Sequence, residues 1–330
     1  MKSKIELNHT SFLILIKDEE FFSRKLVNHI NSQNVKAEFI IADGSKKKQK
    51  KIFDKLKPKK KYYYFGEDKD IITFLQKTNK GINKCSKKFI LFCDQDDLVN
   101  FKTVKNDEEF LLKNKNYSAV GSAVYNFIYI KNKIKVTKTL YGVYYFDFKS
   151  FFLKYFFNIN FRSYYYLHRK KNLKKIKSLI KKYKMKDVRS VMFMQDFLTL
   201  TFGRIKYHND TLALRWVGVK KRDGQKKKSH FINQSFKDRN AWYKYFFSRE
   251  KILINKILND NKIFFSNFFM FKIFFFIFDI TVNVFKRNIG YRLLIRIIDK
   301  ISNKLNDNDQ VKIYKKLKLD QIIKQKDLYK

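Results

Sequence analysis

The first 100 residues alternate between two hydrophobic periods, and this alternation limits the possible folds more than any other feature of the chain. Short apolar runs typical of buried strands are each followed by apolar residues spaced three or four apart, as on one face of a helix. The predicted strands are 12–16, 39–42, 62–65 and 89–93, and the predicted helices lie within 18–30, 52–56 and 71–82. Strands that alternate with helices form a parallel sheet, so the sequence predicts an α/β fold.

Acidic residues follow two of these predicted strands. Asp43 ends the second strand, and Asp94, Asp96 and Asp97 follow the fourth. Right-handed crossovers place the carboxyl ends of parallel strands on one edge of the sheet, where such folds bind their ligands. Carboxylates at such a place commonly hold Mg²⁺ or Mn²⁺ together with substrate phosphates. The alternative is an Asp-rich turn that caps the next helix, but a shared pocket explains both acidic strand ends together.

The net charge of +44 indicates, at first sight, binding to nucleic acid or to an anionic membrane. A compositional skew toward Lys, Phe, Tyr, Asn and Ile, as an A/T-rich coding sequence produces, explains part of that charge without any function. The chain has no P-loop and no Gly-x-Gly-x-x-Gly turn, which counts against a P-loop ATPase or a dinucleotide enzyme. Its two cysteines form neither a disulfide framework nor a zinc motif.

Beyond residue 100 the pattern predicts a helix around 104–111, a β-rich segment at 118–130 and a helix at 171–184. Residues 188–202 contain an isolated acid, Asp196, among Met, Phe and Leu. A carboxylate in such surroundings is costly to bury without a partner. Asp196 therefore either caps a helix that begins there or lines a pocket.

Four segments in this order carry a resemblance to a known family: Lys-Asp-Glu-Glu at 17–20, Ile-Ile-Ala-Asp-Gly-Ser at 40–45, Phe-Cys-Asp-Gln-Asp-Asp at 92–97 and Gln-Asp at 195–196. Over residues 10–216 the chain resembles the nucleotide-sugar glycosyltransferases of the GT-A fold, in particular the family 2-like group. The combination is much more specific than any one segment. The resemblance implies a Rossmann-like, mostly parallel sheet with flanking helices.

The resemblance also assigns roles to the acids. Asp43 matches the residue that contacts the nucleotide base, and Asp94 and Asp96 match the Asp-x-Asp that holds the ribose and the Mg²⁺- or Mn²⁺-diphosphate. Asp196 matches the general base, which removes a proton from the acceptor hydroxyl as that oxygen attacks the anomeric carbon. Such enzymes usually invert the anomeric centre.

The sequence departs from the family pattern at three places. Ala42 and Gln195 stand where the family often has Asp and Glu. Arg215-Trp216 is similar to the Arg-Trp of processive members, but the Gln three residues before the arginine is missing, so processivity is not inferred. Arg215 suits the oxygens of a diphosphate; the alternative is a surface arginine beside a core tryptophan.

The length of 330 residues accommodates one large or two ordinary domains. We expect a glycosyltransferase domain at 1–220, with a nucleotide-binding half at 1–100 and an acceptor half at 101–220. A basic, aromatic-rich helical region then occupies 221–330. Its most apolar stretch, 263–285, contains a lysine and an aspartate, which disfavours a membrane span. It is predicted either as a helix buried against the sheet or as a segment lying in the membrane interface.

The resulting hypothesis is a metal-dependent inverting glycosyltransferase of surface polysaccharide or glycoconjugate synthesis. Its donor is a nucleoside-diphosphate sugar, UDP by default, and its acceptor a hydroxyl of a glycan or a lipid-linked molecule. The polar start of the chain favours a cytoplasmic protein, and its basic flanks suit contact with the anionic inner face of the plasma membrane. Two alternatives stay open: a basic nucleic-acid-binding protein, although no nucleic-acid partner is expected, and a catalytically inactive scaffold.

Overall fold

The computed structural model describes residues 4–130, 133–141, 163–183, 188–216 and 256. The predicted C-terminal region, including 263–285, lies outside these residues except for Lys256. Among the helices that can be described, none has both the length and the apolar character needed to cross a membrane.

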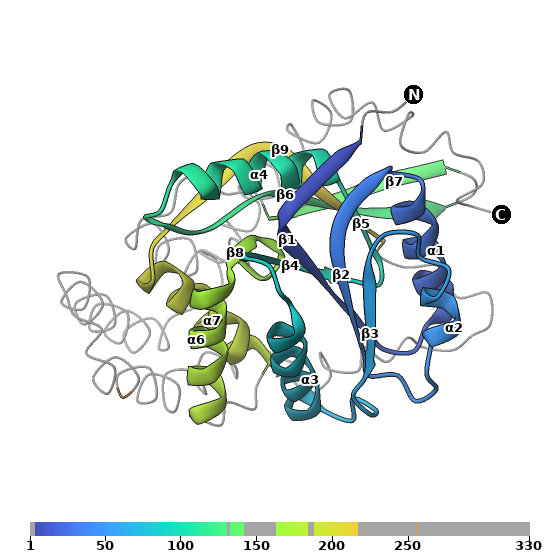
Figure 1. Cartoon of the computed structure of the whole chain (residues 1–330), viewed down its shortest axis with the longest axis horizontal. Coiled ribbons are helices and arrows are strands. Elements are labelled where there is room, and N and C mark those ends of the chain that lie inside the picture. Colours follow the sequence, from blue (N-terminus) through green and yellow to red (C-terminus); the bar gives the residue numbers. More distant parts are fainter. Residues whose placement is uncertain (1–3, 131–132, 142–162, 184–187, 217–255, 257–330) are drawn as a thin grey trace, which may run out of the picture.

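One mixed sheet dominates the structure (Figure 1). Its strands are β1 (Ile5–Ile16), β2 (Val35–Asp43), β3 (Lys60–Tyr64), β4 (Phe89–Asp94), β5 (Asp97–Val99), β6 (Tyr117–Ile130), β7 (Lys133–Tyr141), β8 (Leu167–Arg169) and β9 (Arg204–Trp216). The helices are α1 (Glu20–Asn31), α2 (Lys50–Phe53), α3 (Ile71–Lys84), α4 (Phe101–Lys113), the 3-10 helix η1 (Ser163–Tyr165), α6 (Lys170–Lys182) and α7 (Val188–Thr201). The strand order is β3-β2-β1-β4-β8-β6-β9-β5, with β7 paired to β6.

The first four strands are parallel, as the alternating periods predicted. The chain builds outward from β1 through β2 to β3 and then returns to place β4 on the other side of β1. In open α/β sheets, ligands bind at the carboxyl edge where the strand order reverses in this way. Asp43 pairs with Ile16, and Asp94 pairs with Leu15, so both acidic strand ends lie at that edge.

Both faces of this parallel part are covered, which explains the continuous apolar runs. Side chains alternate along β1, so Phe12 and Ile14 join one apolar cluster while Leu13 and Leu15 join the other. Helices α1, α2 and α4 contribute buried residues to the first cluster, and α3 and α6 contribute to the second. The start of α3 is fixed locally, because Asp70 Oδ1 accepts a hydrogen bond from Thr73 N at 2.8 Å in a capping box.

The second half of the sheet is mixed. Strand β8 is antiparallel to β4 and β6, whereas β6 and β9 run parallel. The predicted β-rich segment 118–130 is β6, and the predicted helices near 104–111 and 171–184 are α4 and α6. Strand β5 pairs antiparallel with the end of β9 and sets Asp97 opposite Arg215. This pairing brings the end of β9 to the acidic turn after β4.

Candidate active site

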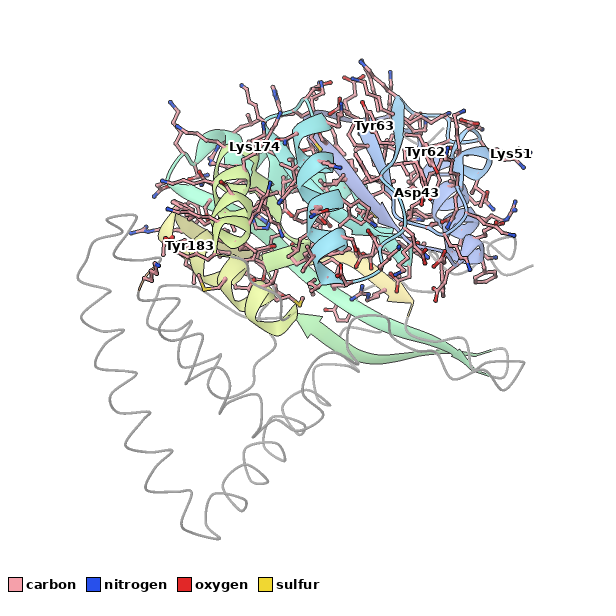
Figure 2. All side chains as sticks on the ribbon, turned by 90° about the horizontal axis from the view of Figure 1, so that it is seen from below. Asp43, Lys51, Tyr62, Tyr63, Lys174 and Tyr183 are labelled. Carbon is pink, nitrogen blue, oxygen red and sulfur yellow. The ribbon has the colours of Figure 1, made fainter. Side chains whose placement is uncertain are left out.

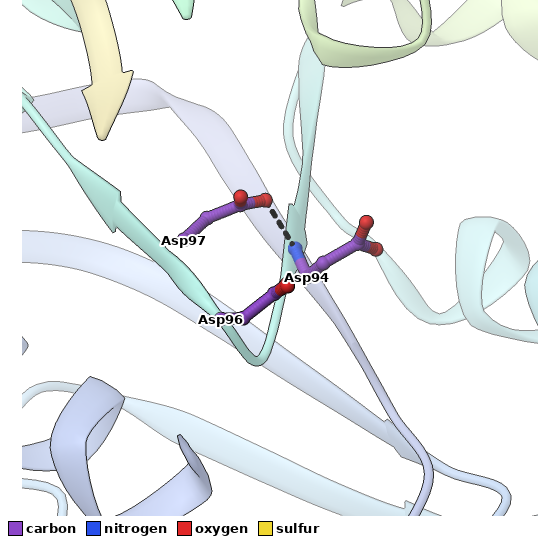
Figure 3. Close-up of side chains that lie close together, drawn as sticks. All are labelled: Asp94, Asp96 and Asp97. Atoms are coloured by element: carbon purple, nitrogen blue, oxygen red, sulfur yellow. Dashed lines mark hydrogen bonds between the residues drawn. The ribbon is translucent and has the colours of Figure 1, made fainter. Parts of the chain in front are cut away.

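The acids after β4 form a compact cluster at the carboxyl edge of the sheet. Asp94 ends β4, Asp97 begins β5, and Asp96 lies between them. One carboxylate oxygen of each lies within 4.8 Å of the others (Figure 3). The alternative that this turn caps the next helix is wrong, because β5 intervenes and the cap of α4 is Asn100, which accepts a hydrogen bond from Thr103 N.

Asp97 is the buried member of the cluster, with 1% of its surface exposed. Its Oδ2 accepts a hydrogen bond from Asp94 N at 2.9 Å, drawn as the dashed line in Figure 3. Its Oδ1 is buried and accepts no hydrogen bond within the described part of the chain. Burial raises the pKa of Asp97 well above its usual value; Arg215 opposes this rise, and the charges of Asp96 and Asp94 reinforce it.

Arg215 supplies the cation nearest to the cluster. Its Nη2 donates to Asp94 Oδ2 at 2.7 Å, while its Nε lies 3.6 Å from Asp96 Oδ2 and 3.7 Å from Asp97 Oδ1. The guanidinium also lies over the ring of Tyr165, 5.0 Å from the ring centroid. Arg215 is therefore part of the acidic cluster, and the alternative of a surface arginine is wrong.

The donor set of this cluster fits a hard divalent cation. Even with Asp97 protonated, the carboxylates of Asp94 and Asp96 outnumber the single guanidinium of Arg215. Asp97 Oδ1, which lies 3.7 Å from Arg215 Nε, accepts no hydrogen bond from the described residues. Mg²⁺ and Mn²⁺ favour such oxygen ligands, and Asp94 and Asp96 are the residues that would hold the ion.

Two tyrosines, which the sequence reasoning did not single out, orient Asp94. Tyr164 OH donates to Asp94 Oδ1 at 3.1 Å, and Tyr165 OH donates to Asp94 Oδ2 at 2.8 Å. Burial, followed by the charge of Asp94, raises the pKa of Tyr164 well above 10, so its hydroxyl stays a donor. Both tyrosines lie on η1, in an aromatic segment without a clear period, and no spacing in the sequence predicts these contacts.

The same turn connects Asp94 to Asp196. Ser163, the first residue of η1, donates from its N and its Oγ to Asp196 Oδ1, each at 2.7 Å. Asp196 is 2% exposed and lies in the interior of α7, so the alternative that it caps a helix beginning there is wrong. A three-residue turn thus joins the predicted base to the predicted metal ligand.

Asp43 has a different environment (Figure 2). Its Oδ1 accepts from Ser45 N at 2.8 Å, and its Oδ2 accepts from Gln49 N at 2.9 Å and from the hydroxyl of Tyr62. It is 0% exposed. Burial and the hydrogen bond to Asp43 raise the pKa of Tyr62, which keeps the phenol protonated as a donor. In this structure Asp43 holds the loop after β2 together, and its role in contacting a base stays a prediction.

The loops after β1, β2 and β4 are bonded to one another. Lys17 N donates to Gln95 Oε1 at 2.8 Å, and Asp18 N donates to Ser45 Oγ at 2.7 Å. Gln49 Nε2 donates to the carbonyl of Asp18 and to Ser45 Oγ. The Asp18 backbone has φ of 50°, a conformation uncommon outside glycine. These bonds fix the shape of the carboxyl edge around the acidic cluster.

Below these loops lies a buried ion pair between Asp68 and Lys77, neither of which the sequence reasoning identified. Lys77 Nζ also donates to the carbonyl of Ile16 at 2.9 Å, which attaches α3 to the end of β1. Burial lowers the pKa of Lys77, and the charges of Asp68, Asp43 and Asp94 oppose that fall. Gly44 is required beside the pair, because a Cβ there would lie 2.2 Å from Asp68 Oδ2.

Solved structures similar to this chain include those of TarS from S. aureus. One TarS structure has 15% sequence identity and a TM-score of 0.40, with 63% of this chain and 36% of that chain covered. TarS 1–349 in complex with UDP-GlcNAc has 14% identity and a TM-score of 0.47, with 76% of this chain and 66% of that chain covered. The chain thus spans only about a third of the longer TarS chain. No curated protein matches this chain.

The family model described as "Glycosyl transferase family 2" matches residues 11–185, which is more than half of the chain. The matched segment contains the second half of β1, strands β2 to β4, the acidic cluster and the turn that orients Asp94. The parallel strands, the reversal at β1 and β4 and the mixed second half agree with the expected GT-A fold. The chain belongs to glycosyl transferase family 2.

Proposed function

We propose that this protein is a metal-dependent, inverting glycosyltransferase that uses a nucleoside-diphosphate sugar. The observation that carries the proposal is the acidic cluster at the strand-order reversal. There the two carboxylates of Asp94 and Asp96 face the single guanidinium of Arg215, and Asp97 Oδ1 accepts no hydrogen bond from the described residues. A bound Mg²⁺ or Mn²⁺ would neutralise charge on the departing nucleoside diphosphate. The loop network around β1 and β2 borders the region proposed for the nucleotide.

The proposed chemistry assigns a role to each charged group. Asp94, oriented by its tyrosines, and Asp96 bind the cation and the diphosphate, and Arg215 donates hydrogen bonds to phosphate oxygens. Asp196, oriented by the two hydrogen bonds from Ser163 to its Oδ1, accepts the proton of the acceptor hydroxyl. The acceptor oxygen forms its bond to the anomeric carbon as the bond from that carbon to the diphosphate breaks, which inverts the centre.

The acceptor is proposed to be a hydroxyl of a glycan or a lipid-linked molecule, in the synthesis of a surface polysaccharide or glycoconjugate. The net charge of +44 supports contact with an anionic membrane surface. We accordingly propose a cytoplasmic protein that is peripheral to the inner face of the plasma membrane. UDP is the commonest carrier in the family and is the first nucleotide to test.

A thermal-shift titration tests the proposal directly. UDP, GDP, CDP and dTDP are each added with Mn²⁺ and, separately, with EDTA, because a ligand that binds only the folded state raises the unfolding temperature. We expect one nucleotide to raise that temperature with Mn²⁺ and to lose most of the effect with EDTA. The same titration with Asp96→Asn should show no metal-dependent rise.

Two results would contradict the proposal. One is the absence of a shift with any nucleotide in the presence of Mn²⁺. The other is tight, salt-sensitive binding of RNA or DNA without a nucleotide effect, which would favour the nucleic-acid alternative. A nucleotide shift with no turnover of any donor would instead favour an inactive scaffold.

A further inference from the structure

We propose that Arg215 makes the acidic cluster selective for a cation that binds together with a diphosphate. Its guanidinium competes with a bare cation for Asp94, and a nucleoside diphosphate removes this competition by offering the guanidinium other acceptors. This inference rests on the proposed metal site and on the proposed contact of Arg215 with phosphate. The cation and the nucleotide therefore bind tightly only as a pair.

The competition arises at the carboxylate of Asp94. Its Oδ2 accepts hydrogen bonds from Arg215 Nη2 at 2.7 Å and from Tyr165 OH at 2.8 Å. A carboxylate oxygen has about two lone-pair directions, so the guanidinium and the phenol together occupy this oxygen. The other oxygen, Oδ1, already accepts from Tyr164 OH at 3.1 Å. A cation that binds Asp94 therefore takes the remaining direction of Oδ1 or displaces the guanidinium from Oδ2.

The fold holds the charge of Arg215 beside the acids. The pairing of β5 with β9 sets Arg215 opposite Asp97, and the guanidinium lies 5.0 Å from the centre of the Tyr165 ring. Its Nε is 3.6 Å from Asp96 Oδ2, so a cation held by Asp94 and Asp96 meets a second positive charge nearby. The side chains of Arg215, Asp94 and Asp96 are only 22–23% exposed. Water and salt therefore screen the repulsion between the two cations weakly.

A diphosphate removes both causes of the competition. A guanidinium donates parallel N–H bonds to phosphate oxygens, so Arg215 can exchange Asp94 for the ligand and leave a lone pair of Oδ2 to the cation. The negative charge of the diphosphate also reduces the repulsion between the cation and the guanidinium. Because coupling between ligands is reciprocal, the cation strengthens nucleotide binding by the same factor by which the nucleotide strengthens cation binding.

The first test measures the dissociation constant of Mn²⁺ without nucleotide, from the EPR signal of the free ion. Arg215→Met removes the competing charge and should bind Mn²⁺ about 10-fold more tightly than the wild type, a factor in the usual range of coupling between sites. If Arg215 only contacted phosphate, this constant would stay the same. If Arg215 only supported the acids, its removal would weaken Mn²⁺ binding.

A second variant keeps the test decisive if Arg215→Met does not fold. Arg215→Gln is also neutral but retains an amide that can donate to a carboxylate, and it should likewise bind bare Mn²⁺ more tightly than the wild type. Arg215→Lys keeps the positive charge and should bind bare Mn²⁺ nearly as weakly as the wild type. The matched control is Arg204→Met, which removes an exposed arginine from the other end of β9 and should leave the Mn²⁺ constant in place.

The coupling itself is measured by calorimetry with the nucleotide that gives the largest thermal shift among UDP, GDP, CDP and dTDP. The dissociation constant of this nucleotide is determined with EDTA and with Mn²⁺, and the ratio of the two constants is the coupling factor. We expect a smaller factor in Arg215→Met and Arg215→Gln than in the wild type, because these variants have no competing guanidinium for the nucleotide to remove.

The outcomes separate this inference from the proposed function. If the wild type binds no Mn²⁺ even with a nucleotide, the acids are not a metal site and the proposed function fails. If the wild type binds Mn²⁺ with a nucleotide, yet neither neutral variant binds the bare ion more tightly, only the role of Arg215 is overturned. Equal tightening in Arg204→Met would also overturn it, because the effect would then come from the net charge of the protein.

Discussion

The ends of β2 and β4 carry carboxylates at the same edge of one sheet, yet the two groups of acids have different environments. Asp43 accepts three hydrogen bonds and is completely buried. In the cluster, Asp94 also accepts three hydrogen bonds, but the three carboxyl groups share one guanidinium, and Asp97 Oδ1 accepts no hydrogen bond from the described residues. Acids at the same edge of a sheet can therefore have different surroundings, and the charge and the hydrogen-bond donors around each acid make different predictions for Asp43 and for the cluster.

The largest expected effect comes from Asp96→Asn. Removing this carboxylate should lower kcat by about 10³-fold, since a preorganised charge in an active site contributes on that scale. The free energy of unfolding should stay the same or rise, because one repulsion inside the cluster is removed. Transfer assays and urea unfolding on the same preparation measure both quantities.

A suitable control for this prediction is Asp54→Asn, which removes an exposed carboxylate paired with Lys50 at 3.0 Å. Its kcat should be unchanged. An unchanged kcat in Asp96→Asn as well would remove Asp96 from the proposed metal site and end the contrast between the two strand ends.

Asp43→Asn should have the converse effect. We expect the free energy of unfolding to fall by about 3 kcal/mol, because an amide cannot accept from all of the donors that face Asp43 and leaves a buried one unsatisfied. Urea unfolding measures the loss. A variant that unfolds like the wild type but binds the nucleotide much more weakly would show that Asp43 acts on the ligand rather than on the loop.

Tyr62→Phe gives the smallest effect. It removes one of the three donors to Asp43 and leaves the two backbone donors in place. The free energy of unfolding should fall by about 1 kcal/mol, with nucleotide affinity retained. A fall as large as that of Asp43→Asn would assign the stability of the loop to the tyrosine rather than to the carboxylate.

The part of the fold that sequence predicts best is the part built from neighbouring segments. Each strand from β1 to β4 has its own run of apolar residues. Asp43 lies at the end of one such run, and Asp94, Asp96 and Asp97 lie at the end of another, so their place at the sheet edge could be predicted. Strands β5 and β8 contain three residues each, which is too short for a period to be visible. The contact of Arg215 with Asp94 joins residues 121 positions apart and depends on the register of β9.

The buried lysines were missed for a different reason. Residue type predicts exposure for lysine, and α6 contains many lysines, so Lys177 does not stand out by composition. Its place on the helix was informative, because it lies four residues after Leu173 and three before Ile180, on the buried stripe. Lys77 is likewise buried within α3. The partners of both lysines depend on tertiary packing and could not be predicted from spacing.

The bonded loops after β1, β2 and β4 have a consequence for the thermodynamics of ligand binding. A loop that is free in the unbound protein loses conformational entropy when a ligand orders it, and this loss weakens binding. Here Lys17, Asp18, Ser45, Gln49 and Gln95 order the edge through contacts within the protein. The entropy of this region is lost during folding, so a ligand bound there keeps more of the free energy of its own contacts.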